Sequence, residues 1–125
     1  MATLTPKLTL TGTAADFGAA LSLSVTGTLT VGAPSKGITR EDVSAGATLD
    51  IYVDSGSAGT VYVYAKNNNT TGSGYVDIKT TAGVSYGTLE NGDFAFIPVD
   101  ANEGIEVLGV TSAVEVEYGY WTKTT

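Results

Sequence analysis

A two-residue alternation of apolar and polar side chains is the feature that most constrains the fold of this chain. From Leu21 to Val31, aliphatic residues occupy nearly every second position, and serine or threonine stands between them. Side chains of a β-strand point alternately to opposite faces, so this segment has one aliphatic face and one hydroxyl face. Gly27 interrupts the alternation and predicts a bulge or a bend there.

The same period recurs along most of the chain, and no segment shows the spacing of an amphipathic helix. Thr13–Ala20 is expected to form one helical turn at most. Roughly eight or nine short strands separated by turns predict an all-β, antiparallel β-sandwich, of jelly-roll type, with an extended N-terminal arm or edge strands. Pro98 restricts its own strand to an edge or terminal position. The expected strands are residues 8–10, 21–31, 49–53, 60–66, 75–79, 84–89, 94–99, 105–107 and 113–121.

The chain has 125 residues, which suits one structural domain. Residues 1–45 are poorer in aromatic side chains than residues 46–125, so we expect an arm with edge strands followed by a compact core. Gly32–Gly37 is the expected hinge between them. The N-terminal segment Ala2–Val31 has two interpretations: it adds a strand to the sheet of a neighbouring molecule, or it supplies edge strands to its own domain.

The composition excludes several classes of function. The sequence has no histidine and no cysteine, so a Ser-His-Asp triad, a thiolate zinc site and a cysteine nucleophile are impossible. Its net charge is −7, and its basic residues are scattered singly, so we expect neither nucleic acid nor an anionic membrane as a partner. Met1–Lys7 lacks a basic region followed by an apolar run, which predicts synthesis in the cytoplasm without a secretion signal.

Acidic residues provide the remaining candidates for chemistry. Asp100–Glu106 loosely resembles a calcium loop, but its glycine comes one position too early and the composition is also that of an ordinary turn. Asp50 with Asp54, and Glu115 with Glu117, are carboxylate pairs of a kind that glycosidases use, although a solvated acidic face is the commoner explanation. We therefore expect no enzymatic activity, no metal site and no cofactor.

Aromatic side chains are the better candidates for a binding surface, because tyrosine and tryptophan combine a large apolar area with a polar tip. They could form a sugar-stacking platform, a contact with another subunit or simply part of the core. The aliphatic face of the arm is the second candidate. The expected contact residues are Tyr62, Tyr64, Tyr118, Tyr120 and Trp121, and on the arm Leu8, Leu10, Leu21, Leu23 and Val25.

Several stretches, taken together, give the chain a resemblance to small structural proteins of tailed bacteriophages. The resemblance is one of style and order over most of the chain, and it includes no catalytic signature. The stretches are Lys7–Thr11 with Ala20–Thr26, Val61–Asn67, Leu89–Val99 and Val116–Lys123.

The resemblance implies a non-enzymatic virion protein, of which capsid decoration (cement) proteins are the best-known small β-rich class. Its implied partners are further copies of itself, as a dimer or trimer, and the major capsid protein, and its implied location is the capsid surface. Two alternatives remain open. One is a tail, neck or fibre-base protein of the virion, and the other is a carbohydrate-binding β-sandwich module that uses Tyr62, Tyr64 and Trp121.

Overall fold

The structure, a computed structural model, describes residues 2–13 and 20–124. Every regular element in those residues is a β-strand, as the alternation predicts. The helical turn considered for Thr13–Ala20 falls mainly on residues 14–19, which lie outside the described part of the chain.

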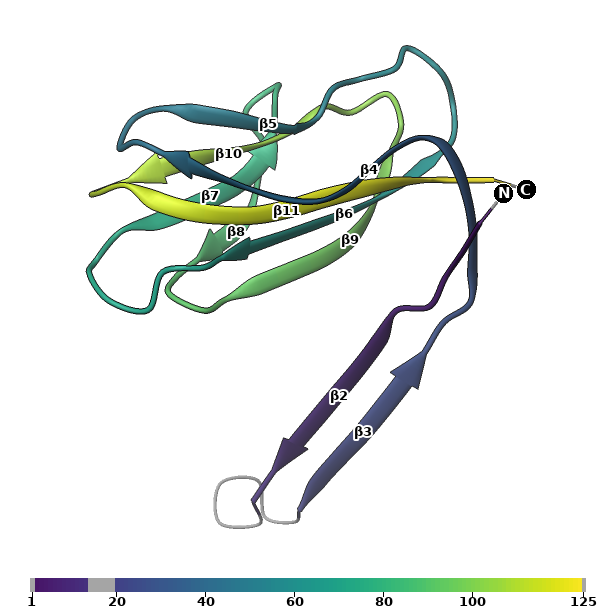
Figure 1. Cartoon of the computed structure of the whole chain (residues 1–125), viewed down its shortest axis with the longest axis horizontal. Coiled ribbons are helices and arrows are strands. Elements are labelled where there is room, and N and C mark those ends of the chain that lie inside the picture. Colours follow the sequence, from purple (N-terminus) through teal and green to yellow (C-terminus); the bar gives the residue numbers. More distant parts are fainter. Residues whose placement is uncertain (1, 14–19, 125) are drawn as a thin grey trace.

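Eight strands, β4 to β11, form two antiparallel sheets that pack face to face (Figure 1). One sheet has the order β4-β11-β6-β9, with the short β1 added outside β4, and the other has the order β5-β10-β7-β8. From β4 to β11, every connection crosses from one sheet to the other except the one between β7 and β8. This connectivity, together with the two strand orders, is that of a jelly roll. The predicted antiparallel sandwich is therefore confirmed. The strands are β1 Ala2–Leu4, β4 Leu29–Val43, β5 Thr48–Tyr52, β6 Thr60–Asn67, β7 Tyr75–Thr80, β8 Ser85–Leu89, β9 Phe94–Asp100, β10 Ile105–Val110 and β11 Val114–Lys123.

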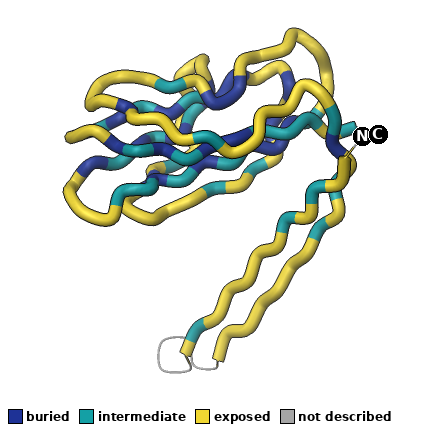
Figure 2. Tube along the Cα trace, in the orientation of Figure 1, coloured by how far each residue is buried: buried dark blue, intermediate teal, exposed yellow. Residues whose placement is uncertain are grey.

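The core lies between the two sheets and is built from every second residue of their strands (Figure 2). On β6, the side chains of Val61, Val63 and Ala65 are completely buried. Strands β7 and β10 alternate in the same way between buried and half-buried positions. Burying one Val or Ile side chain stabilises a fold by about 1.5–3 kcal/mol, so the two-residue period determines which face of each strand turns inward.

A two-stranded hairpin projects from one end of the sandwich and is separate from both of its sheets (Figure 1). It consists of β2 (Lys7–Gly12) and β3 (Leu21–Thr26), and almost all of its residues are exposed (Figure 2). The Gly27 amide donates a hydrogen bond to the Pro6 carbonyl at 3.0 Å, which closes the base of the hairpin. The interruption expected at Gly27 is therefore the point where the chain turns from the hairpin into the sandwich.

Two prolines lie within strands at positions where no ladder hydrogen bond is needed. Pro98 is on β9, which is the edge strand of its sheet, as predicted. Pro34 lies at a register shift, because Trp121 of β11 pairs with Ser35 and the next residue pairs with Gly32. The structure thus continues β4 through Gly32–Gly37, where a hinge was expected, since the bulge accommodates the proline without ending the strand.

The first 45 residues contribute to both parts of the molecule. They form the hairpin, and they also form β4, which pairs with β11 and places Val43 in the core. β1 pairs with the start of β4, so that Ala2 lies opposite Val31. The hairpin is therefore attached at both of its ends to β1 and β4, the two paired strands at one edge of the larger sheet.

Candidate interaction surface

Two of the five aromatic residues proposed as contacts point into the sandwich. Tyr118 is 1% exposed and belongs to the core, where its hydroxyl accepts a hydrogen bond from the Lys36 Nζ at 3.2 Å. Tyr120 is half-buried against the core, and its ring meets the edge of Tyr52 at a centroid distance of 5.1 Å. Their burial makes these two side chains part of the packing, which is one of the three interpretations that the sequence left open.

The other three aromatic residues lie on the outer face of the larger sheet. Tyr62 of β6 is the register partner of Trp121 on β11, and Tyr64 follows two positions along β6 on the same face. Tyr62 itself is only 8% exposed, because its ring stacks on Phe96 with a centroid distance of 5.9 Å. Of these three outer-face residues, Tyr64 and Trp121 remain partly open to solvent.

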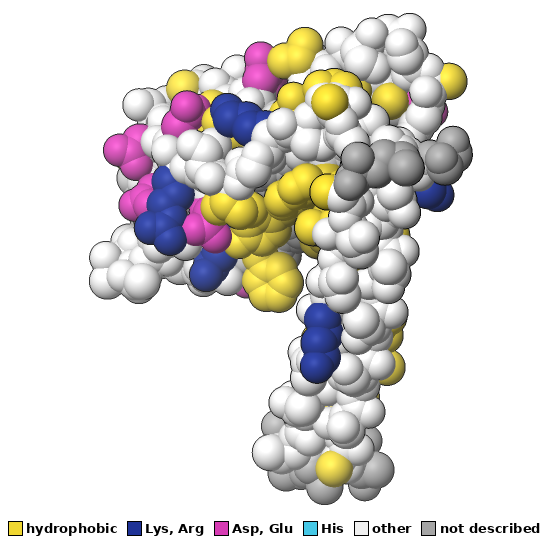
Figure 3. All heavy atoms as spheres, turned by 45° about the vertical axis from the view of Figure 1, so that its right-hand side comes forward, with side chains coloured by type: hydrophobic (Ala, Val, Ile, Leu, Met, Phe, Trp, Pro, Cys, Tyr) yellow, Lys and Arg dark blue, Asp and Glu magenta, His cyan; other side chains and the backbone are white. Residues whose placement is uncertain are grey.

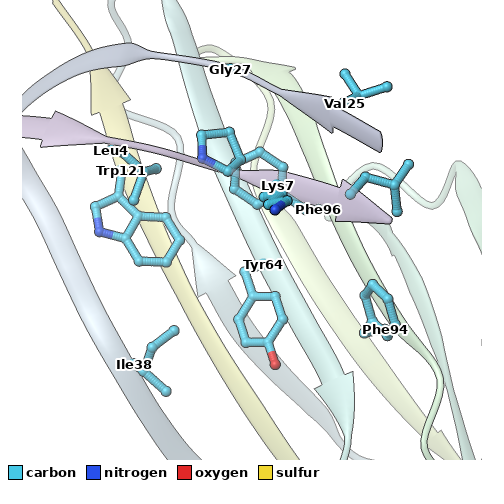
Figure 4. A pocket seen from close by; sticks show the side chains of 11 residues that line it. Leu4, Lys7, Val25, Gly27, Ile38, Tyr64, Phe94, Phe96 and Trp121 are labelled. Carbon is cyan, nitrogen blue, oxygen red and sulfur yellow. The ribbon is translucent and has the colours of Figure 1, made fainter. Parts of the chain in front are cut away.

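These two side chains line an apolar groove in the angle between the sandwich and the hairpin (Figure 3). The groove has a volume of about 590 Å³. The sandwich side of the groove is formed by Ile38, Tyr64, Phe94, Phe96 and Trp121. The other side is formed by Leu4 of β1 and, at the hairpin and its base, by Pro6, Lys7, Leu8, Val25 and Gly27 (Figure 4).

Three of the five residues on the sandwich side of the groove were not predicted from the sequence, and a signal for two of them was present. Phe94 and Phe96 alternate with Ala95, Ile97 and Val99, so the strand shows an aromatic face opposite an aliphatic one. Phe94 is 61% exposed and Ile38 is 54% exposed. No local pattern marks Ile38, because its β4 position reaches this groove only through the pairing of β4 with β11.

The five aliphatic residues proposed for the arm lie together on one face of the hairpin. The register pairs Leu8 with Val25 and Leu10 with Leu23, and cross-strand partners point to the same face. All five side chains keep between 40% and 53% of their surface exposed. Leu8 and Val25 also line the groove, so the aliphatic face of the hairpin begins in the groove and continues along the hairpin.

A hydrogen-bonded network borders the groove. The Tyr64 hydroxyl donates to Glu117 Oε1 at 2.8 Å, and the Arg40 Nε donates to Glu117 Oε2 at 2.8 Å. Burial, together with the bond to the carboxylate, raises the pKa of Tyr64 to about 12. The hydrogen bonds from Tyr64 and Arg40 lower the pKa of Glu117 below its usual value. At neutral pH the phenol is therefore protonated and the carboxylate ionised, and the pair holds the Tyr64 ring in place without exchanging a proton.

Several of the other acidic candidates have structural partners: the Asp54 Oδ1, for example, accepts the Gly56 amide at 2.6 Å. Asp100 Oδ1 accepts the Asn102 amide at 2.9 Å within its own turn, and Glu106 forms an ion pair with Lys79 at 3.5 Å. Glu115 and Glu117 both lie near Arg40. Within residues 2–13 and 20–124, no group of three acidic side chains is placed to hold a metal ion.

Comparisons with known proteins add little to this geometry. The chain matches no protein-family model, and it matches no curated protein. Among solved structures it is similar to a chain of the disulfide-linked pili formed by Bacillus endospore appendages, with a TM-score of 0.48 and 21% sequence identity. That match covers 77% of this chain and 95% of the other. In the described part of the chain, no helix has the length and hydrophobicity that a membrane crossing requires.

Proposed function

We propose that this protein is a non-enzymatic structural component that acts by associating with copies of itself. The observation that carries the proposal is the hairpin, whose five aliphatic side chains lie on one exposed face. An isolated two-stranded sheet is at best marginally stable in water, and it needs an apolar partner to become a lasting element. Most of the exposed large apolar residues of the described chain lie on the projecting arm or in the groove beside it, and such a surface is suited to assembly.

The particular assembly we propose is the virion of a tailed bacteriophage, with the protein as a decoration protein on the capsid surface. The resemblance in the sequence supports this setting, and the jelly-roll fold is compatible with it. A decoration protein needs many modest contacts repeated over a symmetric shell, and no catalytic groups. The major capsid protein is then the second partner, and a tail, neck or fibre-base position is the alternative within the virion.

Purified parent particles provide the test of this setting. We expect quantitative mass spectrometry to find the chain in a simple ratio to the major capsid protein. We also expect particles stripped of the chain to break at a lower temperature than intact ones. A handful of copies per particle would favour the tail, neck or fibre base, and a chain missing from particles would remove the virion from the proposal.

A carbohydrate-binding module is the second candidate, because Tyr64 and Trp121 both line the groove. A sugar-stacking platform was expected to use the rings of Tyr62, Tyr64 and Trp121. Tyr62 is buried, so two of these three rings are open to a sugar. Trp121 is the single tryptophan of the chain, so its fluorescence reports on the groove directly. A glycan panel that leaves this fluorescence unchanged would exclude the sugar-binding function.

A further inference from the structure

We propose that the groove beside the hairpin binds a single-chain amphipathic carboxylate of the fatty-acid type. In this arrangement, the alkyl chain lies against the aromatic rings of the larger sheet, and the carboxylate pairs with the Lys7 ammonium at the base of the hairpin. Such a ligand is separate from the proposed self-association, and its binding does not depend on it.

The size and the lining of the groove are those of a small-molecule site. Its volume is about 590 Å³, and ligand sites commonly enclose about 300–1,000 Å³ between apolar and aromatic side chains with few polar groups. Phe94 and Ile38 are more than half exposed, so an alkyl chain lying on them would remove apolar surface from water. The groove lies in an angle between the sandwich and the hairpin, and this concave shape suits one narrow chain (Figure 3).

Lys7 determines the sign of the charge that the groove accepts. Of the described residues that line the groove, Lys7 is the only charged one, and it lies among the aromatic lining residues (Figure 4). Its backbone is fixed there, because the adjacent Pro6 carbonyl accepts the hydrogen bond that closes the hairpin base. On the sandwich side, Lys66 is the cross-strand partner of Phe94, and cross-strand partners share a face, so a second ammonium borders the groove. An ammonium beside an apolar surface is complementary to a carboxylate on an apolar chain.

The carboxylates on this face of the sheet are paired or lie beyond the groove. Each Glu117 oxygen accepts a hydrogen bond, one from Tyr64 and one from Arg40. The pKa of Tyr64 is about 12, so its phenol adds no negative charge at neutral pH. Asp42 and Glu115 are register partners, and each is two residues farther from the groove than the Arg40 and Glu117 pair. An anion in the groove therefore meets positive charge first, although the whole chain has a net charge of −7.

Titration of the full chain with alkyl ions tests the site. Trp121 is the single tryptophan and lines the groove, so its emission reports binding directly. The probe is sodium octanoate, kept below the concentration at which it forms micelles, and octylammonium chloride is the comparison of equal chain length and opposite charge. We expect octanoate to change the emission saturably and to bind about fivefold more tightly than octylammonium. Decanoate should bind roughly tenfold more tightly than octanoate, because it buries two further methylene groups.

Lys7→Gln should weaken octanoate binding by about fivefold and remove the preference over octylammonium. The matched control is Lys79→Gln, because Lys79 lies on β7 of the other sheet, where it pairs with Glu106, and it should leave both affinities unchanged. Emission that does not change saturably with octanoate would overturn the proposal, as would equal affinities for the two ions or equal effects of the two variants. Octanoate binding that weakens as the protein is concentrated, with a rising mass in light scattering, would overturn it as well, since another copy would then fill the groove.

Discussion

Asn67 is the residue on which the end of β6 depends. Its side chain is completely buried, and its Nδ2 donates to the Leu89 carbonyl at 3.0 Å and to the Gly74 carbonyl at 3.3 Å. Its Oδ1 accepts the Asn69 amide at 3.0 Å. One amide group therefore joins three parts of the chain near the end of β6. The sequence shows only a polar run that predicts a loop, because nothing local reveals which of three successive asparagines is buried.

We predict that Asn67→Ala lowers the free energy of unfolding by about 2–4 kcal/mol, because two carbonyls and one amide lose their buried partner. Urea denaturation measures the change. Asn91→Ala is the matched control, since Asn91 is exposed and donates to a single carbonyl, that of Gly72. Similar losses in the two variants would contradict the role given to Asn67.

Tyr64 and Glu117 predict a dependence on pH. The pKa of Glu117 is lower in the folded chain than its unfolded value of 4.5, so its contribution to stability is present above that value. The contribution is lost as the pH falls through the folded pKa. Tyr64 behaves in the opposite sense, because its folded pKa of about 12 exceeds 10.0: its contribution is complete below pH 10.0 and is lost as the pH rises toward 12.

We expect Tyr64→Phe to reduce the free energy of unfolding at neutral pH by about 1–2 kcal/mol, since it removes a hydrogen bond to a charged group. The reduction should shrink as the pH falls below 4.5 and through the lower folded pKa of Glu117, because the carboxylate that accepts the hydrogen bond is then protonated in the folded chain as well. Urea titrations at neutral pH and at about pH 3 measure both values. Tyr86→Phe, at an exposed ring on β8, should change neither, and a Tyr64→Phe effect that is independent of pH would argue against the ionic hydrogen bond.

At the scale of elements, the hairpin and the sandwich differ in what stabilises them. Each sandwich strand buries one face against the opposite sheet, whereas β2 and β3 have only their mutual hydrogen bonds and one shared aliphatic face. The free energy of local opening is therefore low in the hairpin and close to the global value in β6 and β11. The proposed self-association would stabilise the hairpin by mass action and leave the stability of the core unchanged.

Hydrogen exchange tests this difference within one molecule. We predict that the amides of β2 and β3 exchange at least about tenfold more slowly when the protein concentration rises from about 1 to about 100 μM, because association covers them. The amides of β6 are the internal control and should keep the same rate. Hairpin exchange that is fast at both concentrations would show that no partner copy covers it.

On the scale of the whole molecule, the jelly roll is a scaffold that holds an arm at one end. The Gly27 amide and the Pro6 carbonyl lie 3.0 Å apart, so the two ends of the hairpin meet where the sandwich begins. Residues 7–26 can therefore be replaced by an Asn-Gly turn, which suits a two-residue hairpin connection. The sandwich should then keep its core, because none of the described residues of the replaced segment, 7–13 and 20–26, belongs to it.

We predict that this shortened chain is a folded monomer. Its urea unfolding should stay cooperative, and light scattering should give the mass of one chain where the natural protein gives a multiple. Leu10→Ser with Leu23→Ser in the full chain should lower the mass in the same way, whereas Thr9→Ser with Ser24→Thr, on the opposite face, should leave it unchanged. An undiminished mass in the shortened chain would place the assembly contact on the sandwich.

The sequence by itself determined the all-β class, the positions of β5 to β11 and the face that each of these strands turns inward, because all three follow from a two-residue period that is local to each strand. It also marked the aliphatic face of the arm, from Leu8 to Val25. It did not mark β1 or most of β4. Only the tertiary structure decided that Tyr118 is core while Tyr64 borders a groove, and that Ile38 joins Phe94 and Trp121. Those placements depend on the strand order β4-β11-β6-β9 and on the angle at which the hairpin leaves the sandwich. Pairing between distant strands is a long-range property, and no local pattern of side chains encodes it.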